Sequence, residues 1–436
     1  MAGRAGGQHK NHIRFLTVCR RNYQEGEKTE KATEYQHFFR FHNLDILPGL
    51  LAGTVIFREG VIQIATTPKL PEPCSAGYGV LALTAICGEL PADQLHRLPG
   101  GDSYKSKVIQ SLKSQKLLRT FYRDSLRGYR LTQAAKSLLC DAYPERFSFA
   151  LTGAAETNHI KSEITRRLRL HRIAEATITM MNAGVWFHRD EKPDIFAPTW
   201  EHGVRPFLSA PVFYNSREIK EMGTVFVKIH GARSVGVLLS PTQIFVVYNL
   251  GECLMKWDYK SEMRTKALMK TALCNNRLSH LYTPDSVSGL LLGNKLSLAY
   301  DILTGQARSQ YFLLDGNYEH FYFLTNDRHG ERLLQLLCSS ELTNQMEDIL
   351  LADLYEGNES SALENDAFDE VGDPILLGYT LDLPRIKRFN TALNLQGRSG
   401  TLICFDYQKE ILQRYCCSKV RFQTIDFQKW ERSFFE

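Results

Sequence analysis

Apolar and polar residues between positions 76 and 146 follow the pattern of three helices, a hairpin and a closing helix. The three helical stretches end at a glycine, at a Pro-Gly turn and at a polar run, which are common helix stops. Asp102 or Ser103 is expected to cap the third helix, and Thr132 the closing helix. The expected elements are helices at 79–88, 91–98 and 103–115, strands at 117–123 and 129–131, and a helix from 133. This order predicts a winged helix-turn-helix.

Beyond residue 150, short apolar runs typical of buried strands alternate with amphipathic helical stretches. Such alternation predicts an α/β (α+β) fold, in which an N-terminal winged helix-turn-helix precedes an α/β domain. No internal repeat is visible in the sequence. The expected division is a polar segment with a β-hairpin at 1–75, the winged helix at 76–146, an α/β core at 150–345, an acidic loop at 346–373 and an α/β extension at 374–436.

Composition narrows the protein class. The chain has 436 residues and ten cysteines, none in a Cys-x-x-Cys pair, so a zinc ribbon is not expected. The N-terminus lacks the apolar stretch of a secretory signal, and no run approaches the roughly 20 apolar residues of a membrane span. We therefore expect a cytoplasmic protein that does not bind a membrane.

Charge is distributed unevenly around a net value of +5. The segment from Glu347 to Asp373 contains ten acidic residues and no basic one. A run of this composition is typical of a solvated loop, with competition against nucleic acid for a basic surface as the alternative.

The third helix of the predicted winged helix has an apolar face and a polar, basic face. Val108, Ile109 and Leu112 share the apolar stripe, and no acidic residue lies on the opposite one. From Asp102 to Arg130 the chain has eight basic and two acidic residues. Since a winged helix presents this helix to the major groove, we predict an interface for double-stranded DNA. The predicted contacts are Ser103, Ser106, Lys107, Gln110, Lys113, Arg119, Arg123 and Arg127. The alternative is a winged helix that contacts only proteins.

Several sequence motifs resemble the replication-relaxation family, whose members are encoded on plasmids and integrative conjugative elements. The resemblance extends over about residues 76–340. It rests on the motifs Val80-Leu-Ala-Leu-Thr-Ala-Ile-Cys-Gly-Glu-Leu-Pro91, Ser103-Tyr-Lys-Ser-Lys-Val-Ile109, Arg127-Gly-Tyr-Arg-Leu-Thr132, Phe213-Tyr-Asn-Ser-Arg-Glu-Ile-Lys220 and Ile244-Phe-Val-Val-Tyr-Asn249. It implies a role in replication, relaxation or conjugative transfer of mobile-element DNA. It also implies a nuclease-like second domain of restriction-endonuclease type and partners within a relaxation or replication complex; self-association stays open.

One stretch matches a nuclease motif. Pro193-Asp194 followed by Glu218-Ile-Lys220 has the order PD…ExK, which would bind Mg²⁺ or Mn²⁺. Glu218 does not lie in an apolar strand, however, and Glu218 and Lys220 are more typical of an exposed helix edge. No other cofactor or metal is expected, because the chain has no P-loop or nucleophile elbow. Three functions remain open: a non-catalytic DNA binder, which is favoured, a metal-dependent nickase or nuclease, and a transcriptional regulator whose α/β domain senses a ligand or dimerises.

Overall fold

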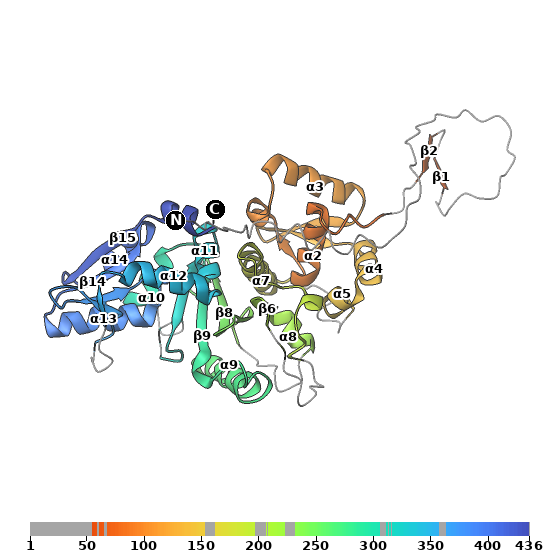
Figure 1. Ribbon diagram of the computed structural model, residues 1–436. Helices are drawn as coiled ribbons and strands as arrows, with labels where there is room; N and C mark the ends of the chain where they lie inside the picture. The colour runs from red at the N-terminus through yellow and green to blue at the C-terminus, as the bar shows by residue number, and fades with distance from the viewer. Residues whose placement is uncertain are drawn as a thin grey trace, which may run out of the picture.

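The protein combines helices and sheets throughout, in agreement with the α/β class. The computed structural model describes residues 55–58, 61–64, 68–152, 162–196, 206, 208–222, 232–305, 311–312, 314, 316–356 and 363–435. Figure 1 shows an N-terminal part beside two α/β units that follow one another along the chain. No helix within the described ranges has the length and apolar character needed to cross a membrane.

The expected N-terminal hairpin is present: β1 (Val55–Arg58) pairs antiparallel with β2 (Val61–Ile64). The rest of the polar segment up to residue 67 lies outside the described residues.

The N-terminal part surrounds a small antiparallel sheet with the strand order β3-β5-β4. Thr132 caps α4 as predicted, because its hydroxyl accepts a hydrogen bond from the Ala135 amide. The predicted cap of α3 is wrong: Gly101 is the N-cap residue, and the Asp102 carboxylate pairs with Lys105 at 2.9 Å. The elements are α2 (Ala76–Cys87), β3 (Leu90–Pro91), η1 (Ala92–Arg97), α3 (Asp102–Ser114), β4 (Leu118–Arg123), β5 (Leu126–Leu131), α4 (Gln133–Ala142) and α5 (Pro144–Leu151).

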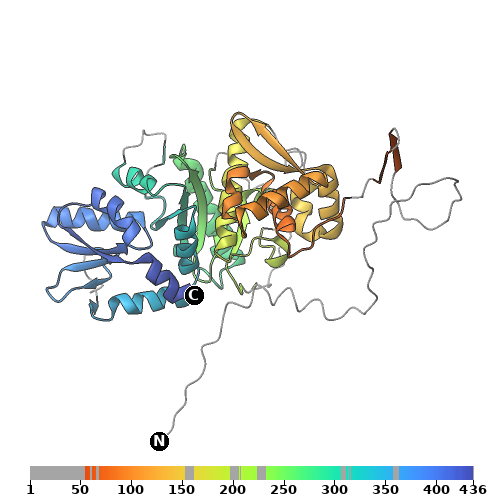
Figure 2. The same ribbon diagram turned by 90° about the horizontal axis from the view of Figure 1, so that it is seen from above.

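The first α/β unit is built on a five-stranded sheet whose strands are all buried. Strands β6, β7 and β8 form an antiparallel meander, and β8, β9 and β10 run parallel. Helix α7 contacts α2 and β3 on one side and β6 and β8 on the other, so it joins the N-terminal part to this sheet (Figure 1, Figure 2). The elements are α7 (Ile164–Asn182), η2 (Arg189–Glu191), β6 (Val212–Asn215), α8 (Ser216–Met222), β7 (Gly236–Leu239), β8 (Ile244–Gly251), α9 (Tyr259–Met269), the π-helix η4 (Lys270–Arg277), β9 (Val287–Gly293), α10 (Ser297–Thr304), β10 (Phe321–Thr325) and α11 (Arg328–Leu337).

The second α/β unit repeats this topology. Strands β11, β12 and β13 form an antiparallel meander, and β13, β14 and β15 run parallel. In both units a helix precedes the meander, and helices connect the parallel strands. The elements are α12 (Ser340–Leu351), β11 (Tyr355–Glu356), β12 (Ala367–Phe368), β13 (Pro374–Leu377), α13 (Leu383–Gln396), β14 (Gly400–Phe405), α14 (Asp406–Tyr415), β15 (Val420–Ile425) and α15 (Phe427–Phe435).

Equivalent helices of the two units pack against each other. Helix α10 contacts α14. Arg328 and Arg332 of α11 each donate to Glu431 of α15 at 2.7 Å. The chain therefore contains a topological repeat that the sequence pattern did not reveal.

The predicted acidic loop at 346–373 is wrong in part: among its described residues, 346–351 belong to α12, and 355–356 and 367–368 form the strands β11 and β12. Several of its carboxylates are paired with arginines of the same unit, which reduces their capacity to compete for a distant basic surface. The pairs are Glu364 with Arg385 and Arg388, Asp366 with Arg385, and Asp369 and Asp373 with Arg421. Because β11 pairs with β12 and β12 with β13, this segment and the predicted extension at 374–436 belong to one unit.

Candidate nucleic-acid interface

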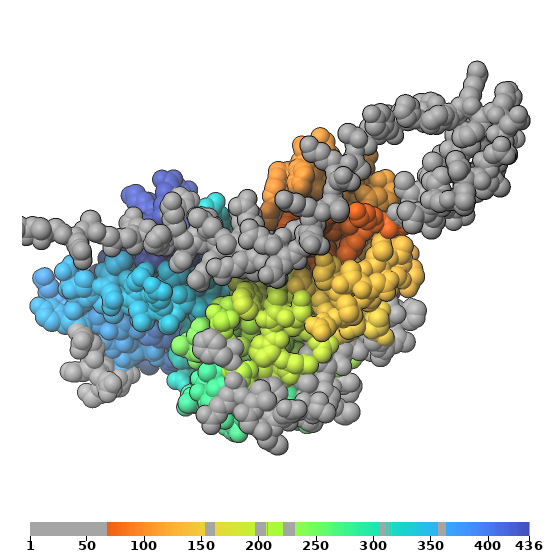
Figure 3. Space-filling view, turned by 45° about the vertical axis from the view of Figure 1, so that its right-hand side comes forward, coloured from red at the N-terminus to blue at the C-terminus, as the bar shows by residue number. Residues whose placement is uncertain are grey.

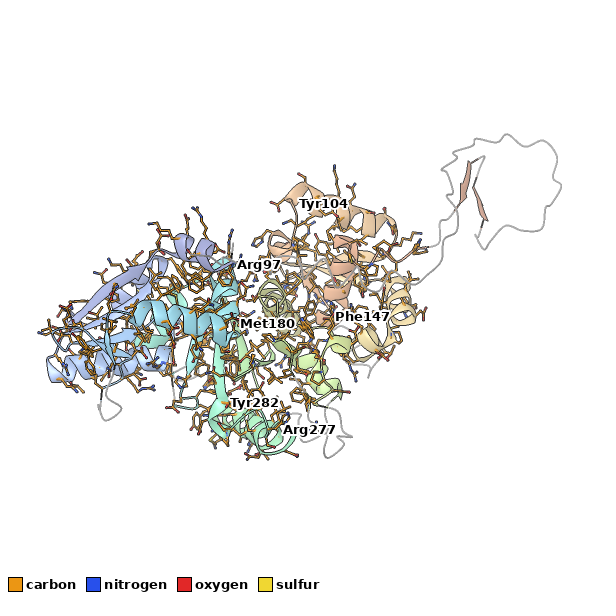
Figure 4. The ribbon with its side chains drawn as sticks, viewed as in Figure 1. Arg97, Tyr104, Phe147, Met180, Arg277 and Tyr282 are labelled. Atoms are coloured by element: carbon orange, nitrogen blue, oxygen red, sulfur yellow. The ribbon has the colours of Figure 1, made fainter. Side chains whose placement is uncertain are left out.

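Helix α3 presents a polar face to solvent and an apolar face to the N-terminal core. Ile109 and Leu112 are 5% and 2% exposed and belong to the core that α2 also forms. The opposite face carries residues spaced three and four apart, which places them on one side of the helix. These residues, all exposed, are Ser103, Ser106, Lys107 and Gln110. In Figure 3 the orange surface that includes α3 projects from the molecule, and Figure 4 shows Tyr104 on its outer side.

The remaining predicted contact residues of the β4–β5 hairpin lie on two different faces of it. Tyr122 lies directly opposite Arg127, so their side chains share a face. The next pair on that face includes Tyr129, whose ring centroid lies 5.3 Å from the Lys113 ammonium group of α3. Lys113 and Arg127 are therefore continuous with the polar face of α3.

Arg119 and Arg123 occupy the other face of the hairpin, because side chains alternate along a strand. Both are exposed, but they point away from the α3 side. The structure thus brings together six of the eight predicted contacts and separates these two from them.

Tyr122, which is 69% exposed, lies beside Arg127 but is not among the contacts predicted from the sequence. A tyrosine opposite an arginine on an exposed hairpin offers a flat apolar ring beside a cation, and both groups suit contact with a nucleotide. The β4 sequence carries no signal for this, because Tyr122 lies on the same face of the strand as the buried Leu118.

Two of the eight cations counted in this stretch are buried and serve the fold. Lys105 is 7% exposed and donates to the carbonyls of His96 and Leu98 at 3.0 and 3.3 Å. Arg130 is 4% exposed and donates from Nε to Glu89 at 2.7 Å. The basic surface is correspondingly smaller than the sequence count indicates.

Glu89 is the centre of a buried ionic cluster, which we call the Glu89 cluster: Glu89, Arg130, Arg167 and His171. Arg167 Nη2 lies 2.5 Å and His171 Nε2 2.9 Å from Glu89 Oε1. Gly128 makes room for the carboxylate, since a Cβ atom at this position would lie 2.3 Å from Oε1.

Burial raises the pKa of Glu89, but hydrogen bonds from His171, Arg167 and Arg130 outweigh it and bring the pKa down to about 2. The carboxylate therefore stays charged at neutral pH and joins β5 of the N-terminal part to α7.

The three residues of the candidate nuclease motif have different environments. Asp194 is half-exposed and pairs with Arg189 at 3.1 Å, and Lys220 is exposed on α8. Glu218 is 1% exposed, so the expectation of an exposed helix edge is wrong for this residue. The Asn215 side chain accepts from the amides of the first turn of α8, and Glu218 turns inward to Lys192.

The Glu218–Lys192 pair is a buried ion pair. Lys192 Nζ donates to Glu218 Oε2 at 2.7 Å and to the Phe213 carbonyl. Burial raises the pKa of Glu218 and lowers that of Lys192. Among the described residues, no group of three or more His, Cys, Asp or Glu side chains is arranged to hold a metal ion.

Comparison with protein-family models, curated proteins and solved structures finds no match to this chain.

Proposed function

We propose that the chain binds double-stranded DNA through a winged helix-turn-helix formed by residues 76–146. The order of helices and the sheet order β3-β5-β4 support this assignment. In a winged helix, α3 would enter the major groove and the β4–β5 hairpin, the wing, would contact the backbone.

The observation that carries the proposal is the one-sided basic face of α3 and the wing. Within the part of the chain that the structure describes, Lys107 and Arg127 make no ion pair and remain open to a polyanion. The two acidic residues of the stretch are each paired locally, Asp102 with Lys105 and Asp124 with Arg123.

The chemistry of the face divides into two roles. Lys107 and Gln110 would reach base edges, where lysine suits guanine and glutamine suits adenine. Lys113 and Arg127 would neutralise phosphates, and the release of counterions makes such binding dependent on salt.

The resemblance to the replication-relaxation family supports a role in replication, relaxation or transfer of mobile-element DNA. A non-catalytic binder is favoured over a nickase, because the buried strands β7 and β8 carry no carboxylate or lysine that could serve a metal-dependent nuclease. We also propose, from the same resemblance, that the first α/β unit has a restriction-endonuclease-like fold.

A charge-reversal experiment tests the proposal. Lys107→Glu with Arg127→Glu should abolish the gel shift of duplex DNA at low salt, because repulsion replaces two attractive contacts. The matched control is Lys387→Glu with Lys419→Glu, which makes the same change in net charge at two exposed positions of the second α/β unit. Equal affinity of wild type and the first variant would overturn the proposal.

Two further assays separate the alternatives. Relaxation of supercoiled plasmid with Mg²⁺ or Mn²⁺ that is lost in Glu218→Ala would identify a nickase. Preference for the element's own promoter over its replication origin would identify a transcriptional regulator.

A further inference from the structure

We propose that Arg167, a residue of α7 outside the winged helix, positions the wing for DNA binding. The inference rests on the proposed function, but its structural part can be tested without DNA. Arg167 is fully buried, and α7 also packs against the first α/β sheet, so the arginine connects the wing to that unit.

The tip of the wing is a strained two-residue turn. Asp124 and Ser125 have φ angles of 52° and 60°, a conformation that β-hairpins of this length require and that glycine or asparagine adopts most easily. Non-glycine residues persist in this region only where surrounding contacts hold them.

Arg167 supplies such contacts on both sides of the turn. Its Nη1 donates to the Arg123 carbonyl at 2.8 Å, and its Nη2 donates to the Leu126 carbonyl at 3.1 Å. These two residues face each other as the last pair of the hairpin, so one guanidinium group fixes both ends of the turn.

The same guanidinium group is held in place by the Glu89 carboxylate and by the ring of Phe121. The centroid of that ring lies 4.7 Å from Arg167 Cζ. Its fork geometry cannot be reproduced by lysine, which has a single ammonium group. Any movement of α7 would therefore shift the wing and the orientation of Arg127, and the first α/β unit would influence DNA affinity through this residue.

The test compares hydrogen exchange of the wing amides (Leu118–Leu131) in full-length variants. Arg167→Lys keeps a positive charge opposite Glu89 and removes the fork. We expect exchange at the wing tip to accelerate about tenfold, while α2 amides stay protected. Affinity for duplex DNA should fall by a similar factor. Arg166→Lys is the matched control, because it makes the same change at an exposed arginine of the same helix, which pairs with Glu163.

A rescue separates positioning from general destabilisation. Ser125→Gly relieves the strained turn and should restore wing protection and part of the DNA affinity in the Arg167→Lys background. Unchanged wing exchange in Arg167→Lys, or equal acceleration in α2 and the wing, would overturn the inference. A wild type that binds no DNA would instead contradict the proposed function and leave the exchange result interpretable.

Discussion

Two sets of cations arise from the same stretch of chain, between Asp102 and Arg130, and have opposite environments. Lys107 and Arg127 are exposed, whereas Lys105 and Arg130 are buried against carbonyls and a carboxylate. A run of basic residues therefore predicts a polyanion-binding surface only when the cations that are buried in the fold are left out of the count. Substitutions in the buried set should lower the stability of the fold, whereas substitutions in the exposed set should lower DNA affinity.

The largest effect is expected at the centre of the buried set. Glu89→Gln removes the only carboxylate that the structure places within hydrogen-bonding distance of both Arg130 and Arg167 in the described residues. Leaving buried charges uncompensated should lower the free energy of unfolding by about 3–5 kcal/mol. Urea denaturation measures this change. Asp102→Asn is the control, since the Asp102 carboxylate is exposed and solvent screens its pair with Lys105. Equal losses in the two variants would contradict the contrast.

The stability of the fold at acid pH should depend on the same Glu89 cluster. The pKa of Glu89 is lowered from its ordinary 4.5 to about 2, so the folded state binds this proton less readily than the unfolded state. Its stabilising contribution is complete above the unfolded pKa and is lost as pH falls from about 4.5 toward 2. Thermal melting across this window should show a steeper loss for wild type than for Glu89→Gln. Parallel curves would contradict the assignment.

Single substitutions in the exposed set should weaken DNA binding without affecting the fold. Arg127→Ala should reduce affinity for all duplex sequences alike and make the salt dependence shallower by about one phosphate contact. Lys107→Ala should instead weaken preferred sites more than random DNA, by about 1–3 kcal/mol. Fluorescence anisotropy with specific and random duplexes measures both. Identical behaviour of the two variants would show that α3 does not read bases.

The smallest effect is expected at Lys116, an exposed cation with a φ angle of 56°. Lys116→Gly removes the strain of this backbone conformation and should stabilise the fold by less than about 1 kcal/mol. Duplex affinity should change little, because Lys116 follows the end of α3. A large loss of affinity would extend the exposed set to this residue.

The sequence predicted features that depend on near neighbours. The amphipathic spacing of α3 and the Thr132 cap were correct because their partners lie within a few residues. The Glu89 cluster could not be predicted, since the other three members lie 41 to 82 positions from Glu89 and their pairing with it depends on how α7 docks.

The repeated topology of the two α/β units was also hidden, because the same strand order is built from dissimilar residues. β7 is Gly-Val-Leu-Leu, whereas its equivalent β12 spans only Ala367–Phe368. Glu218 was misjudged for a related reason. Its burial depends on Lys192, 26 residues earlier, and on the Asn215 cap that turns it inward.

The salt dependence of duplex binding by the full-length wild type tests the central claim most directly. A plot of log affinity against log salt concentration should have a slope of about −2 to −4, as expected when two to four cations of this stretch, Lys113 and Arg127 among them, neutralise phosphates. The slope should be unchanged in the Lys387→Glu, Lys419→Glu control. A slope near zero, or no duplex binding at about 50 mM salt, would contradict the account.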